Sequence, residues 1–350
     1  MLFRCLRLER VFISTWVACV VLGVSLRWSV GGDFHVPITI SKDAQEALAK
    51  FSRSASRAPL PVHDDIDGWK KVQAAIEKKY ASASAAVVER YRPQIQTRKL
   101  GGVPVLDIKP KGWKNGDKRV LVYTHGGAYT MYSARSRLLS AVPMANDTTL
   151  RVIAVDYTLA PHAKWREVTD QVLSVFKTLL DQGHALENIG IYGESAGGGL
   201  AAGAVLKMRD KGMGVPAAVV LWSPWSDITR AGDSYTTLQA ADPLLYYPKN
   251  LKNCADAYAA PTDQKHPYVS PVYGDYSKGF PPTLIQAGTK EIFLSNAVRQ
   301  YQVLDQAGIP VKLDLYEGMW HIFQVFNYGL PESKTAREKV RVFLERHLRN

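Results

Sequence analysis

From about residue 98 onward, short runs of β-forming residues alternate with helical stretches, and this alternation constrains the fold more than any other feature. Seven runs are typical of strands: residues 103–110, 119–126, 151–157, 188–195, 217–224, 282–288 and 311–318. Amphipathic helical patterns cover residues 167–183, 199–212 and 295–308 between them. Strand and helix in alternation predict an α/β fold, in which a mostly parallel central sheet carries helices on both faces.

Two regions do not follow this alternation, one that precedes it and one that interrupts it. Ahead of it, residues 40–53 and 67–91 have helical spacing of their apolar residues, and Asp67 is a candidate N-cap of the second helix. Within it, residues 230–280 are rich in Asp, Tyr, Pro and Lys, which predicts an insertion that lies over the sheet.

The first 30 residues have the pattern of a targeting segment. Three arginines in residues 1–10 precede the mostly apolar residues 11–26. The apolar run is longer than a usual signal core and shorter than the ~20 residues that span a bilayer. We therefore predict either an export signal or an N-terminal membrane anchor, with the rest of the chain outside the cytosol in both cases. A buried N-terminal helix is the third interpretation.

Cysteine content and charge exclude several classes of protein. Cys5 and Cys19 lie in the leader, so Cys254 alone cannot form a disulfide framework in the body of the chain. No Cys/His spacing typical of a metal site occurs. The net charge of +12 indicates a basic surface, an attraction to anionic membranes or an acidic substrate, and no nucleic-acid-binding motif accompanies it.

The stretch GESAG, Gly193–Gly197, has the G-x-S-x-G pattern of a nucleophile on a tight strand-to-helix turn. A glycine-rich phosphate loop is the competing interpretation. Against it, the glycine spacing after Ser195 is G-x-G-x-x-x-G, and Gly199 stands where a Walker lysine would be needed. Ser195 is therefore the candidate nucleophile.

To act as a nucleophile, a serine hydroxyl needs a histidine base and an acid that orients the histidine. In proteins with a G-x-S-x-G turn, the acid follows the serine in the sequence and the histidine follows the acid. His321 comes after a predicted strand, whereas His266 lies in a surface loop and His347 in a terminal helix. Two acids follow strands, Glu291 and Asp227. Glu291 is preferred because its strand is expected beside the one that leads to His321; Asp227 is the alternative, and Asp242, in the insertion, is set aside.

An oxyanion hole is expected from the loop after the strand 119–126. The sequence YTHGGAY lets the backbone approach a substrate closely, and the N–H group of Ala196 adds a donor next to the nucleophile. The loop donors are either Gly126 with Gly127 or Gly127 with Ala128. His125 is expected to hold the loop by a hydrogen bond.

Four motifs together resemble the hormone-sensitive-lipase-like esterases, the bacterial family IV of α/β-hydrolases. They are HGGAY for the family's HGGG, DYTLAP for DYRLAP, GESAGG for GDSAGG, and YEGMWHIF for the histidine loop. The resemblance covers roughly residues 50–350. It implies an α/β-hydrolase fold with Ser195, His321 and Glu291 as the catalytic triad, although the family's usual acid is Asp.

The resemblance also implies a helical cap, here made from N-terminal helices in residues 31–95 and the insertion at about 230–280, over a catalytic domain of residues 96–350. The expected activity is hydrolysis of small-molecule esters with short to medium acyl chains, with no cofactor, metal or nucleic acid. Lactones, arylformamides and steryl acetates are alternative substrates. The plant gibberellin receptors, which bind ligand without catalysis, resemble the same family but have lost the histidine. Membrane association through residues 11–26 and a dimer remain compatible with the sequence.

Overall fold

The computed structural model describes residues 34–52, 58–326 and 328–349, and the expected leader, residues 1–30, lies outside them. Its centre is an eight-stranded sheet in the order β1-β2-β4-β3-β5-β6-β7-β8. The strands are β1 (Gln94–Leu100), β2 (Val103–Lys109), β3 (Val120–Thr124), β4 (Arg151–Val155), β5 (Ile189–Glu194), β6 (Ala218–Trp222), β7 (Thr283–Lys290) and β8 (Val311–Trp320).

All neighbouring pairs from β4 to β8 are parallel, whereas β2 is antiparallel to both β1 and β4. The predicted fold class is therefore confirmed, and each of the seven predicted strands is present.

Both faces of the central strands are buried, as their apolar runs require. Along β3, Val120 and Val122 belong to one hydrophobic cluster, whereas Leu121 and Tyr123 belong to another on the opposite face. Successive side chains of a strand point to opposite faces, so a strand covered on both sides reads as a continuous apolar run. This is why the central strands were recognisable in the sequence.

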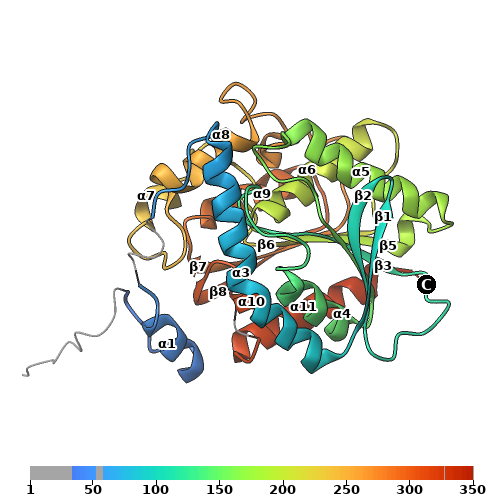
Figure 1. Cartoon of the computed structure of the whole chain (residues 1–350), viewed down its shortest axis with the longest axis horizontal. Coiled ribbons are helices and arrows are strands. Elements are labelled where there is room, and N and C mark those ends of the chain that lie inside the picture. The colour runs from blue at the N-terminus through green and yellow to red at the C-terminus, as the bar shows by residue number, and fades with distance from the viewer. Residues whose placement is uncertain (1–33, 53–57, 327, 350) are drawn as a thin grey trace, which may run out of the picture. The chain divides into compact units, whose positions relative to one another are not determined.

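Helices cover the two faces in separate groups (Figure 1). One face packs against α5 (Trp165–Asp181), α6 (Ala196–Asp210) and α9 (Leu294–Gln306). The other packs against α4 (Leu138–Thr148) and α11 (Pro331–His347), with the short helix α10 (Phe323–Phe326) beside them. Each predicted helix of the alternating region is present.

The N-terminal helices are α1 (Lys42–Ala49) and α3 (Ile66–Tyr91). Helix α1 is shorter than the predicted 40–53 and is capped by the side chain of Ser41. The prediction that Asp67 caps α3 is wrong, because the carboxylate of Asp65 accepts from the Gly68 N–H group at 2.9 Å and Asp67 lies inside the first turn. An N-cap residue needs non-helical backbone angles, which Asp65 has.

Strand β1 and helix α4 were not predicted from the sequence. Strand β1 reads QIQTRKL, and six of its seven residues keep some exposure because it is an edge strand with a solvent-facing side. Helix α4 contains Pro143, a residue that usually ends a helix.

The insertion between β6 and β7 contains α7 (Ser234–Thr237), a helical turn at Tyr247–Leu251, and α8 (Lys252–Tyr258). Across the described ranges, no helix combines the length and apolar character needed to cross a bilayer.

Candidate active site

The strand order changes direction at β3, which pairs with β4 on one side and with β5 on the other. In parallel sheets, ligands bind beyond the carboxyl ends of the strands at such a point. The loop after β3 contains Gly126 and Gly127, and the turn after β5 contains Ser195. Both candidate segments therefore emerge beside each other at the place where this fold class builds sites.

Ser195 sits on a strained turn that only its glycine neighbours allow. Its backbone angles are φ 57° and ψ −127°, a conformation that side-chain-bearing residues rarely adopt. A Cβ on Gly193 would lie 2.2 Å from the Gly197 carbonyl oxygen, and one on Gly197 would lie 2.1 Å from the Thr124 carbonyl oxygen. The turn holds Ser195 at the N-terminus of α6, as the G-x-S-x-G pattern predicts.

Glu194, directly before the serine, has a structural partner that the sequence did not indicate. Its carboxylate is fully buried and forms an ion pair with Arg137, which is itself almost completely buried. The Tyr123 hydroxyl donates to the same carboxylate at 2.8 Å. A buried charge is tolerated only when it is paired, so this contact ties the turn of Ser195 to the start of α4.

His321 and Glu291 are joined by a direct hydrogen bond. The imidazole Nδ1 lies 2.8 Å from Glu291 Oε2, and β7 and β8, which lead to the two residues, are paired neighbours. Glu291 Oε1 accepts from the Ser223 hydroxyl at 2.9 Å and from the Gly288 N–H group at 2.7 Å. With its carboxylate held in this way, Glu291 favours the tautomer in which Nδ1 carries the proton and Nε2 is left free to accept one.

Ser195 and His321 line one cavity of about 480 Å³. Both side chains are mostly buried. Within the described part of the chain, the Ser195 hydroxyl makes no hydrogen bond with the imidazole. Hydrogen bonds between catalytic residues are often long without substrate and shorten when it binds. The observation that relates Ser195 to His321 is therefore the cavity that both residues line.

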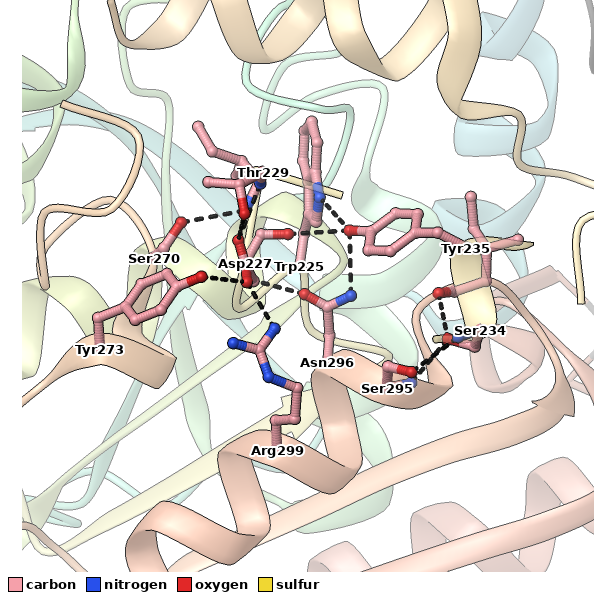
Figure 2. Close-up of polar contacts among 12 residues, drawn as sticks. Trp225, Asp227, Thr229, Ser234, Tyr235, Ser270, Tyr273, Ser295, Asn296 and Arg299 are labelled. Carbon is pink, nitrogen blue, oxygen red and sulfur yellow. Dashed lines mark hydrogen bonds and ion pairs between the residues drawn. The ribbon is translucent and has the colours of Figure 1, made fainter. Parts of the chain in front are cut away.

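Asp227, the alternative acid, lies in a different network (Figure 2). Its Oδ2 atom accepts from Arg299 at 2.5 Å and from the Tyr273 hydroxyl at 2.8 Å. Its Oδ1 atom accepts from the backbone and the hydroxyl of Thr229. The structure thus places Glu291, and not Asp227, against His321, and Asp227 instead connects the insertion to α9.

The other candidate histidines each have a different partner. His266 packs against Trp165 at 4.3 Å between ring centroids, and His347 packs against Phe343 on α11. His125 holds its loop, since Nδ1 lies 2.7 Å from the Gly126 carbonyl oxygen and the ring stacks on Tyr157. Burial lowers the pKa of His125, so it holds the loop as a neutral imidazole.

Gly127 and Ala128, in the loop after β3, line the cavity, whereas Gly126 is buried and is not among its lining residues. Gly127 has φ 113°, and a Cβ there would lie 2.2 Å from the Met131 carbonyl oxygen. Ala128 adopts φ 51° despite its side chain. None of the hydrogen bonds among the described residues is donated by the N–H groups of Gly126, Gly127, Ala128 or Ala196.

Asp242, which the sequence analysis set aside, links this site to the insertion. Its carboxylate accepts from the N–H group of Ile292, the residue after Glu291, at 2.7 Å. It also accepts from the N–H groups of Leu244 and Leu245, at 2.8 Å each, and both residues line the cavity. Complete burial raises the pKa of Asp242 to about 6, against the opposing effect of these hydrogen bonds.

This burial predicts a pH-dependent stability. The folded chain retains the Asp242 proton up to about pH 6, whereas the unfolded chain releases it near 3.8, so the contribution of Asp242 to stability is full below pH 4 and is lost as the pH rises through 6. Relative to Asp242→Asn, the wild type should gain about 2 kcal/mol between pH 7 and pH 4.5. Thermal unfolding of both proteins across this range measures the difference, with Asp305→Asn as an exposed-carboxylate control. A difference that does not change with pH would contradict the assignment.

Across the ranges that the structure describes, no group of three or more His, Cys, Asp or Glu residues is placed to hold a metal ion.

Comparison with known proteins identifies the family of this fold. A family model described as the α/β-hydrolase fold matches residues 121–325. An acetyl-hydrolase from Streptomyces hygroscopicus is 35% identical over 228 residues, which cover 65% of this chain and 76% of the relative. An esterase from Acinetobacter venetianus is 34% identical over 253 residues, which cover 71% of this chain and 81% of the relative.

Solved structures agree as well. One esterase matches with a TM-score of 0.84 and 27% identity over 90% of this chain and 96% of its own. An esterase from the bacterial hormone-sensitive lipase family matches with a TM-score of 0.73 and 28% identity over 85% of this chain and 95% of its own. The chain therefore belongs to the α/β-hydrolases, among the hormone-sensitive-lipase-like esterases.

Proposed function

We propose that this chain is a serine carboxylic-ester hydrolase in which Ser195, His321 and Glu291 form the catalytic triad. The observation that carries the proposal is the His321–Glu291 hydrogen bond of 2.8 Å at the cavity that Ser195 also lines. A nucleophile, a base and a group that orients the base are the three parts that acyl transfer requires.

Hydrolysis then proceeds in two steps. His321 Nε2 takes the proton of the Ser195 hydroxyl as the oxygen attacks the ester carbonyl, and the imidazolium protonates the leaving alcohol. Glu291 stabilises that imidazolium without taking the proton. Water, deprotonated by His321, next attacks the acyl-enzyme and releases the acid together with the free serine.

The developing oxyanion is stabilised by backbone N–H groups. Ala196 supplies one donor from the N-terminus of α6. For the loop donors, the positions of Gly127 and Ala128 at the cavity support that pair over Gly126 with Gly127. Ala128 can take the place of the family's third glycine because the donor is its main chain, already at φ 51°.

The size and the lining of the cavity support the proposal that the substrate is an ester with a short to medium acyl chain. Its volume of about 480 Å³ suits one small ligand, and apolar side chains such as Met131, Leu244 and Leu251 form much of its wall. Residues from the N-terminal region and from the insertion line it, which supports a cap made of both over a catalytic domain of residues 96–350. For residues 1–30 we retain the proposal of an export signal or a membrane anchor.

Stoichiometric acylation tests this proposal. Mixed rapidly with p-nitrophenyl acetate, the full chain should release close to one equivalent of nitrophenolate in a burst, provided that deacylation limits turnover. Inactivation by a phenylphosphonate ester, followed by peptide mass analysis, should place a single adduct on Ser195. Full inactivation with the adduct on another residue would overturn the assignment.

A further inference from the structure

We infer that the site is built for esters that carry a negatively charged group at a distance from the scissile bond, with Lys50 and Lys79 as its binding residues. This inference rests on the proposed ester hydrolysis and names its substrate class.

Three cationic side chains line the cavity. Lys50, Lys79 and Arg137 are among its lining residues, and none of the described residues that line it is Asp or Glu. The charge of Arg137 is balanced by its ion pair with Glu194. The two lysines therefore contribute the uncompensated charge of this cavity.

The lysines come from separate elements that meet at the cavity. Lys50 is the C-cap residue of α1, and Lys79 lies in the middle of α3. Both are exposed, and neither takes part in an ion pair among the described residues, whereas Lys70 on the same helix α3 pairs with Asp67. The ammonium of Lys79 lies 5.6 Å from the centre of the Tyr80 ring, which in turn packs edge-on against Tyr132, and both tyrosines line the cavity.

Two unpaired ammonium groups over an apolar cavity produce a positive potential inside it. Low-dielectric walls focus such a field, which raises the local concentration of anionic ligands and falls with added salt. Because both lysines stay hydrated, each should contribute a few-fold effect and the pair about tenfold. The predicted substrate is thus an ester with a carboxylate or a similar anion outside the bond that is broken.

Two pairs of esters, each an anion and its neutral methyl ester, test the inference. One pair varies the alcohol side, 4-acetoxybenzoate against its methyl ester, and the other varies the acyl side, mono-p-nitrophenyl adipate against its methyl ester. We expect the ratio of kcat/KM, anionic to neutral, to exceed one in the wild type for at least one pair. It should fall about tenfold in Lys50→Glu/Lys79→Glu, and it should fall with rising salt in the wild type.

A matched double variant controls for net charge. Lys42→Glu/Lys78→Glu makes the same change on α1 and α3, at exposed positions that are not among the cavity's lining residues. A wild-type ratio below one for both pairs would overturn the inference. So would a fall of less than threefold in the cavity variant, or an equal fall in the control.

Binding separates this inference from the proposed function. Calorimetric titration of Ser195→Ala with 4-acetoxybenzoate and its methyl ester measures the same charge preference without turnover. If the wild type hydrolysed none of the four esters, the proposed function would fail, and the titration would still decide the inference by whether the anion binds more tightly.

Discussion

Ser195→Ala is expected to lower kcat for ester hydrolysis roughly 10⁴- to 10⁶-fold, the range found when the nucleophile of a serine hydrolase is removed. In the proposed mechanism the Ser195 hydroxyl oxygen forms the covalent bond to the acyl group, so its removal eliminates the acyl-enzyme. Hydrolysis of p-nitrophenyl butyrate, with the burst measured separately, gives both the rate and the fraction of active protein.

The fold should survive this change. Alanine and serine bear similar strain at φ 57°, and the Ser195 hydroxyl makes no hydrogen bond among the described residues that the variant would lose. Circular dichroism and thermal unfolding should therefore match the wild type within about 0.5 kcal/mol. A variant that is folded and retains more than a hundredth of the activity would mean that another residue is the nucleophile.

Glu291→Gln is expected to lower kcat about 10³- to 10⁴-fold. The glutamine amide can still accept from Ser223 and Gly288 through its oxygen, but it turns an NH₂ group toward His321. The imidazole then favours the tautomer with the proton on Nε2, which cannot take the serine proton. Because the geometry is nearly preserved, KM should change far less than kcat.

Asp227→Asn is the matched comparison, since it makes the same chemical change at the alternative acid. It leaves the Arg299 guanidinium without its carboxylate in a partly buried network, so stability should fall by about 1–3 kcal/mol. The folded variant should keep kcat within about threefold, as its carboxylate does not contact His321. If Asp227→Asn lost kcat as far as Glu291→Gln, the acid assignment would be wrong.

Much of the fold could be predicted because its central strands are buried on both faces. Apolar runs such as residues 120–123 are strong signals, and each of the seven predicted strands is present. Strand β1 could not be found in the same way, since its polar sequence is stabilised by pairing along β2 rather than by its own composition. Helix α4 was hidden by Pro143, which the buried packing of the helix tolerates.

The site was predictable where chain position determines geometry. Gly193–Gly197 specify a local turn, and a histidine after β8 must lie near an acid after β7 once those strands are neighbours. Glu291 and Asp227 both follow strands, so their positions in the sequence do not identify the triad acid. Only the hydrogen-bond partners of the two carboxylates in the structure distinguish them. Asp242 could not be recognised, since one of its three backbone partners, Ile292, lies 50 residues further along the chain.

The proposed catalytic groups are carried by four different strand ends, after β3, β5, β7 and β8. During synthesis the ribosome releases Ser195 well before His321, and β8 joins the sheet at its far edge. With the proposed triad, a nascent or truncated chain that lacks β8 has the nucleophile without its base, so we expect it to be inactive until the last strand has docked. Recovery of esterase activity after refolding should therefore follow the docking of β8 onto the sheet. In a cell, incomplete chains of this hydrolase should be inactive for the same reason.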